Sequence, residues 1–190
     1  MKRILTHGIS IALMAISVGA MGCASTMVDM AGAMVPTAVI TSQQESFSTS
    51  QVQQIEVLPV LDGRRVVQEK IDFEKTTKGL PKRINRSLGK KGYECLDADT
   101  SANLTSLTPG QIPFANVDQI RKIGSGRTRW VLVPVVENMA EVADVEYNEL
   151  TLLLFDREAG KLAWEGSGSS PKDVSKCLSG VLKKFPGKKK

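Results

Sequence analysis

The residue whose chemistry the sequence indicates most clearly is Cys23, because the residues before it are of the kinds that precede a cysteine with a modified thiol. Small residues lead into it in the stretch AISVGAMGCAS, residues 15 to 25. The chain begins Met1-Lys2-Arg3 and is almost wholly apolar from Ile9 to Ala20. A basic start, an apolar run of about a dozen residues and small residues before a cut are typical of an exported precursor. The run is shorter than the roughly 20 apolar residues of a membrane-spanning helix.

This pattern resembles the lipobox of bacterial lipoproteins, in which the cysteine thiol is alkylated by a diacylglyceryl group before cleavage. The resemblance implies a signal peptide over residues 1–22 and a lipid-bearing first residue at Cys23. Ala20 stands where Leu is usual, so a plain secretory signal with a chance cysteine is the alternative. Two or three acyl chains anchor firmly, since each buried methylene contributes about 0.8 kcal/mol. Ala24 follows instead of Asp, which by resemblance to Gram-negative sorting implies the periplasmic face of the outer membrane over the inner membrane.

Removal of residues 1–22 changes the chemistry that remains. It takes away His7, the only histidine, together with Lys2 and Arg3, so the formal charge falls from +5 to +3. A mature chain without histidine excludes Ser-His-Asp and Cys-His triads and every histidine-ligated metal site. We therefore expect a protein that is not an enzyme and that holds no metal and no cofactor.

The remaining chain is expected to form one domain behind a tether. Residues 23–50 have few charges and end in a Ser/Thr/Gln-rich run, which predicts a lipidated N-terminus and flexible tether. The domain is expected over 51–185, followed by a basic tail, 186–190. Apolar spacing predicts strands within 52–60, 93–97, 129–138, 147–158 and 161–169, and helices within 72–92, 114–124 and 170–185.

This order, β-α-β-α-β-β-β-α, predicts an α/β (α+β) fold with a mixed sheet of about five strands and helices packed on it. Pro134 lies inside the strongest strand pattern. It indicates a bulge or an unpaired position there.

The succession IEVLPV, SLGKKGYECLD, GSGRTRWVLVPVVEN and LTLLLFDREAGKLAWEGSGS is similar to a group of small bacterial lipoproteins over about residues 52–185. Their α/β domain resembles the N-terminal domain of TolB, and the group includes LpoB, PelC and CsgG. The resemblance implies a non-enzymatic binding or accessory role in envelope assembly, export or peptidoglycan-synthase regulation, with an envelope protein as partner. It supplies no catalytic residues.

Two alternatives stay open: a ring-forming, homo-oligomeric subunit of an export complex, and an envelope hydrolase that works without histidine. The connection at 137–146, ENMAEVADVE, is too short and too acidic to cross lipid as barrel strands. Pore formation is therefore not expected.

Three further groups of residues could carry chemistry. Cys95 and Cys177 could form a disulfide in an oxidising compartment, or could be two separate buried thiols. The GSG at 124–126 with Arg127 and Arg129 could cradle a phosphate, but the glycines follow a helix pattern, which favours a simple helix stop. The acidic set could be paired carboxylates, a calcium site or a solvated acidic loop, and the last is favoured: Glu137, Glu141, Asp144, Glu146 and Glu149.

A basic surface is the remaining candidate. Its members fall within the first helix pattern: Lys82, Arg83, Arg86, Lys90 and Lys91. With the tail, they are either solubilising charge or a contact for an anionic surface. Nucleic acid is not an expected partner, because the chain is exported and lacks interleaved aromatic residues.

Overall fold

The computed structural model describes residues 39–43, 47–64, 67–68, 70–97, 107–142, 145–171 and 173–188. Cys23, the signal peptide expected over 1–22 and most of the expected tether lie outside these residues. Within the described part, no helix is both long enough and apolar enough to cross a membrane.

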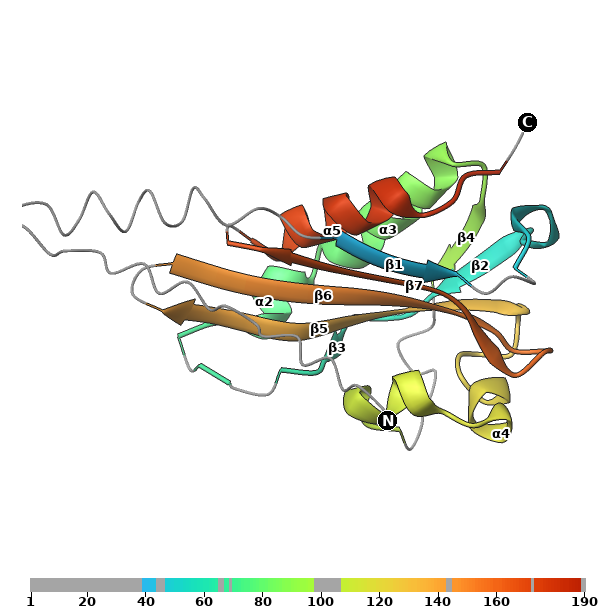
Figure 1. The fold of residues 1–190 in the computed structure, drawn as a ribbon, viewed down its shortest axis with the longest axis horizontal. Coiled ribbons are helices and arrows are strands. Elements are labelled where there is room, and N and C mark those ends of the chain that lie inside the picture. The colour runs from blue at the N-terminus through green and yellow to red at the C-terminus, as the bar shows by residue number, and fades with distance from the viewer. Residues whose placement is uncertain are drawn as a thin grey trace, which may run out of the picture.

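The described residues form one mixed sheet, and its strands are β1 (Val39–Gln43), β2 (Gln54–Val57), β3 (Leu61–Asp62), β4 (Glu94–Asp97), β5 (Trp130–Val142), β6 (Val145–Asp156) and β7 (Lys161–Ser170). The helices are α2 (Phe73–Thr77), α3 (Leu80–Lys90), α4 (Val117–Arg121) and α5 (Val174–Lys184), with short 3-10 turns η1 (Thr49–Gln51) and η2 (Pro109–Phe114). Figure 1 shows the long β5, β6 and β7 running side by side. The α/β prediction is confirmed, with seven strands in the described sheet instead of about five.

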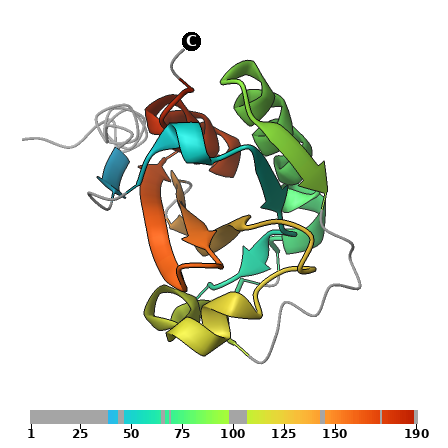
Figure 2. The same ribbon diagram turned by 90° about the vertical axis from the view of Figure 1, so that its right-hand side faces the viewer.

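The strand order is β1-β7-β6-β5-β2-β4, and β3 also pairs with β5. The pairs β2–β4, β2–β5 and β3–β5 are parallel, whereas β1, β7, β6 and β5 pair antiparallel in succession. Helices α3 and α5 cover one face, and α4 with η2 lies on the other (Figure 2). Both faces of β5 are therefore buried over residues 130–136, which is why that part of the strand is an unbroken apolar run.

Helix α3 follows directly from its sequence. Leu80, Ile84 and Leu88 are spaced by four and all are buried, so one face packs on the sheet. Gly92 lies just beyond the helix with φ of +90°, a conformation that glycine adopts without strain. Tyr93 then donates its backbone N–H to the Leu88 carbonyl at 3.1 Å, and the chain continues into β4.

Pro134 occupies a position where its missing N–H costs nothing. The carbonyls of Leu132 and Val136, two residues away on either side, accept from Leu58 and Gly63. Alternate residues of a strand point their backbone groups the same way, so Pro134 faces the gap between β2 and β3. The expected unpaired position is confirmed, while the bulge lies later, between Val136 and Asn138.

The folded region starts earlier than expected. Strand β1 lies inside the predicted tether and pairs with β7 from Val39↔Gly168 to Gln43↔Trp164. Phe47 is also buried, edge-on to the Trp130 ring at 5.7 Å between centroids. β1 was not predicted from the sequence because most of its side chains are exposed and the strand is held mainly by backbone pairing.

The other boundaries differ for local reasons. Residues 137–142 continue β5 instead of forming a connection. The helix expected over 114–124 is only α4, which begins where Asn116 and Gln119 cap each other's backbone N–H. The tail is not wholly free, because the Lys188 N–H bonds the Lys91 carbonyl at 3.1 Å.

Candidate functional site

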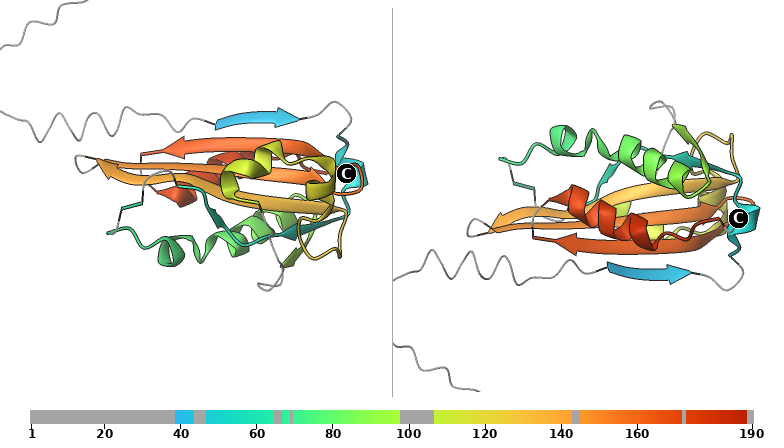
Figure 3. Two further views of the ribbon diagram at one scale, coloured as in Figure 1. Left: turned by 90° about the horizontal axis from the view of Figure 1, so that it is seen from below. Right: turned by 90° about the horizontal axis from the view of Figure 1, so that it is seen from above.

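The predicted basic residues meet in a groove between two helices. Helices α3 and α5 lie side by side on the same face of the sheet (Figures 1 and 3). A groove of about 670 Å³ runs between them, and its charged lining is Arg83, Arg86, Lys90, Lys91 and Lys183. Four of the five predicted basic residues therefore share one site, and Lys82 is not among its lining residues. We call this site the α3–α5 groove.

The base of the groove is apolar. Leu178 and Leu182 line it from α5 and are nearly completely buried, so they belong to the core as well as to the groove. Ser87 and Ser179 also line the groove, and of its basic residues only Lys183 comes from α5. Long basic side chains can cover apolar surface with their aliphatic stems while their charged heads reach solvent. The site is thus a shallow channel with cations along its rim.

The charge of these two helices is one-sided. Their sequences, LPKRINRSLGK and VSKCLSGVLKK, contain seven Lys or Arg and no Asp or Glu. Among the described residues, none of the ion pairs uses the side chains of Arg83, Arg86 or Lys183. These cations are therefore available to a ligand.

Helix electrostatics do not account for this arrangement. Lys90 and Lys183 lie in last turns, where a cation stabilises the helix dipole. Lys82 and Arg83 instead lie near the N-terminus of α3, where no acidic residue is present and a cation is unfavourable. The i,i+3 and i,i+4 pairs Arg83–Arg86 and Arg86–Lys90 also repel each other, at about 0.2–0.5 kcal/mol per pair. Such a departure from local rules is typical of a functional surface.

The GSG loop holds an anion, and that anion belongs to the chain itself. Glu56 on β2 is fully buried, and both of its carboxylate oxygens accept from the Ser125 N–H at 3.1 Å. Arg127 lies 3.7 Å from the same carboxylate. Gly124 has φ of +78°, and a Cβ there would lie 2.8 Å from Glu56 Oε2. The phosphate interpretation is therefore wrong, because the loop amide is already occupied.

The Arg129 side chain is also bound to another residue of the fold. Its Nε and Nη2 donate to the two oxygens of Asp156 at 2.9 and 2.6 Å, and Asp156 is only 2% exposed. The Ala159 N–H adds a third hydrogen bond at 3.0 Å. Burial alone raises the pKa of Asp156, but the Arg129 guanidinium and the Ala159 amide outweigh it and hold the pKa below its usual value.

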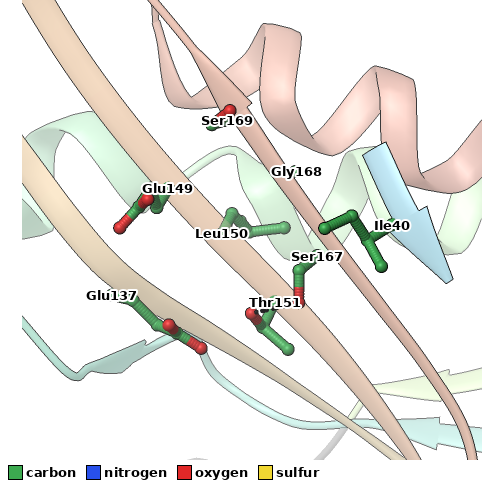
Figure 4. A pocket seen from close by; sticks show the side chains of 8 residues that line it. All are labelled: Ile40, Glu137, Glu149, Leu150, Thr151, Ser167, Gly168 and Ser169. Atoms are coloured by element: carbon green, nitrogen blue, oxygen red, sulfur yellow. Dashed lines mark hydrogen bonds between the residues drawn. The ribbon is translucent and has the colours of Figure 1, made fainter. Parts of the chain in front are cut away.

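The acidic residues do not form one cluster. Glu137 and Glu149 line a separate hollow of about 130 Å³ beside β1, whose Ile40 lies across from them (Figure 4). Glu141 instead pairs with Lys70 at 2.9 Å. No set of three or more potential ligands gathers for a metal ion within the part of the chain that the structure describes. Asp144 lies outside that part.

Cys95 lies in the sheet and Cys177 in helix α5, and both are free. Cys95 Sγ donates to the Asn85 carbonyl at 3.8 Å, and Cys177 Sγ donates to the Asn148 carbonyl at 3.2 Å. Cys95 is on β4, whereas Cys177 sits over β6, and β5 and β2 lie between those strands. Three strand spacings amount to about 14 Å, and a disulfide needs Cα atoms within about 7 Å. The structure therefore favours the alternative of two separate thiols over the disulfide.

We expect both thiols to react slowly in the folded protein. Burial raises the pKa of Cys95 to about 11 and that of Cys177 to about 12. Because the thiolate is the reactive form, maleimide labelling of folded Cys95 should be about a hundredfold slower than in the unfolded chain. The measurement is time-resolved mass spectrometry of a Cys23→Ser variant with and without urea. Rapid labelling of the folded protein contradicts the expectation.

The comparisons with known proteins concern the fold. No family model and no curated protein matches the sequence. Among solved structures, the chain is similar to a PelC dodecamer from Paraburkholderia phytofirmans, with 14% identity, a TM-score of 0.47 and coverage of 77% of this chain and 89% of that one. It is also similar to lipoprotein GNA1162 from Neisseria meningitidis, with 20% identity, a TM-score of 0.46 and coverage of 69% and 90%.

The hypothetical protein CT253 from Chlamydia trachomatis is a third similar structure, with 10% identity, a TM-score of 0.43 and coverage of 70% and 93%. PelC belongs to the group that the sequence resembles. These likenesses extend to the fold alone.

Proposed function

We propose that the protein is a lipoprotein anchored to the periplasmic face of the outer membrane, whose domain binds an envelope protein as a non-enzymatic accessory factor. The observation that carries this proposal is Cys23, placed directly after a basic start, an apolar run and small residues. Lipidation of that thiol attaches everything that follows to a membrane surface.

The position of β1 sets the length of the connection. Fifteen residues, 24–38, lie between Cys23 and the first strand at Val39. A chain of that length spans at most about 50 Å when fully extended. Confinement within that distance of a membrane raises the effective concentration toward a membrane-bound partner to roughly millimolar values. A weak interface is then sufficient for function.

The anchor is tested by a single substitution with a matched control. Cys23→Ser removes the acylated atom, so we expect the protein to leave the membrane fraction and to lose the acyl mass from its N-terminus. Cys95→Ser changes a thiol within the fold and should leave both properties unchanged. Intact-mass analysis and membrane fractionation of the full precursor, expressed in a Gram-negative bacterium, measure both. An unmodified, water-soluble species that begins after residue 23 refutes the anchor.

A ring-forming subunit of an export complex is the second candidate. It is favoured by the edges of the described sheet, where β1 and β4 are the outermost strands, because edge strands can pair with another chain. Native mass spectrometry of the lipoprotein released from detergent separates the two candidates. A monomer at micromolar concentration contradicts the ring, and a single closed oligomer supports it.

A further inference from the structure

We propose that the α3–α5 groove binds an acidic segment of a protein partner. The inference deepens the proposed accessory function, on which it rests, by naming the chemistry of the partner. The groove presents Arg83, Arg86 and Lys183 from two helices that carry no acidic residue of their own. A ligand with carboxylates along its length complements that rim and relieves its internal repulsion.

The shape of the groove favours a peptide segment over a bilayer. Its lining combines Leu178 and Leu182 with basic side chains, four of them from the α3 side and one, Lys183, from α5. A flat lipid surface meets only the outermost of these side chains, whereas a chain segment can lie along the groove between the two helices. Laying a segment into a groove between helices is a common mode of peptide recognition.

One end of the groove lies far from the point where the chain enters the sheet. The chain enters the sheet at Val39, level with Gly168 of β7 and Leu150 of β6. Lys90 and Lys91 lie at the other end of the sheet, just before β4. The first residues of β4 are level with the end of the sheet where Trp130 pairs with Asp156. Leu150 and Asp156 are about 20 Å apart along an extended strand. This end of the groove therefore lies far along the sheet from the point where the chain enters it.

The test uses purified lipoprotein in detergent and a short fluorescent peptide rich in Glu and Leu, with a Gln-for-Glu peptide as the uncharged probe. We expect the acidic peptide to bind and the double variant Arg83→Glu/Arg86→Glu to weaken its binding about tenfold, because each reversal replaces an attraction with a repulsion. Raising the salt concentration should weaken binding to the unmodified protein, since the charges are exposed. Fluorescence anisotropy measures both effects.

A matched variant distinguishes binding at the α3–α5 groove from an effect of net charge on the peptide affinity. Lys75→Glu/Lys122→Glu makes the same change in net charge at exposed positions on α2 and at the end of α4, outside the groove. Its peptide affinity should stay within about twofold of the unmodified protein, because exposed charges beyond a Debye length are screened. The groove variant is expected to fold, since Arg83→Glu places an acidic side chain near the N-terminus of α3, where it favours the helix dipole; thermal unfolding tests this.

Several outcomes overturn the inference. Equal losses in the two double variants mean that only net charge matters, and equal binding of the Gln-for-Glu peptide means that charge does not matter. Vesicles of anionic lipid that bind through Arg83 and Arg86, while the peptide does not, make the membrane the ligand. A concentration-dependent dimer that the groove variant abolishes makes a second copy the ligand. The Cys23→Ser variant should bind the peptide unchanged, so a failed anchor is distinguishable from a failed groove.

Discussion

Asp156→Ala is expected to lower the free energy of unfolding by about 2–3 kcal/mol, because it breaks a buried, doubly hydrogen-bonded ion pair. The carboxylate is nearly inaccessible, and it accepts from Arg129 and from the Ala159 N–H. Alanine leaves both donors without their acceptor. The effect is at the lower end for such pairs, because the Arg129 side chain is 36% exposed and can turn toward water. Urea unfolding of the purified protein measures the change.

Glu158→Ala is the matched control. Glu158 also lies near Arg129, at 3.4 Å, but its side chain is 69% exposed. Exposed pairs contribute about 0–1 kcal/mol, so this variant should differ little from the unmodified protein. Equal destabilisation by the two substitutions contradicts the assignment of the ion pair to Asp156.

The effect of Asp156→Ala should also depend on pH. The pKa of Asp156 is lowered in the folded protein, so the folded state binds its proton less readily than the unfolded chain. The contribution is therefore complete above the unfolded value of about 4 and is lost as the pH falls through the lower folded value. The difference between variant and unmodified protein should shrink as the pH falls below the unfolded value of about 4. A constant difference contradicts this origin.

The parts of the fold that the sequence predicted are those with a clear signal in a short stretch of residues. The spacing of Leu80, Ile84 and Leu88 is that of one helix face, and all three are buried. The valines of β5 form an apolar run because helices cover both faces of that strand. Pro134 marked an unpaired backbone position. In each case the signal itself lies within a few consecutive residues.

The parts that the sequence did not predict depend on contacts between distant segments. Strand β1 has no apolar alternation and exists through its pairing with β7. The GSG loop fits an anion, but only the fold shows that Glu56, about 70 residues earlier, is that anion. Arg83 and Arg86 were recognisable as candidates, whereas Lys183 joined them only because α5 packs beside α3. The groove is thus a property of the packing.

Two glycine-to-alanine substitutions are expected to have opposite effects on stability. Gly166 on β7 lies under the Trp164 ring, and a Cβ there would overlap that ring and lie 2.8 Å from Val181 Cγ1 on α5. Trp164 cannot move aside easily, because it packs edge-on to Phe185 with 4.6 Å between centroids. Overpacking of this kind costs about 1–3 kcal/mol. We therefore expect Gly166→Ala to lower the free energy of unfolding by about 2 kcal/mol.

Gly89→Ala supplies the same methyl group without the collision. Gly89 lies in α3, and nothing is within 4 Å of a Cβ built on it. Alanine is the better helix former, by about 0.5–1 kcal/mol within a helix, so this variant should be slightly more stable than the unmodified protein. Thermal and urea unfolding of both variants give the two signs. If Gly166→Ala proves neutral, Trp164 and α5 can shift to admit a methyl group. In that case the position of α5, which forms one side of the α3–α5 groove, does not depend on its close packing against β7.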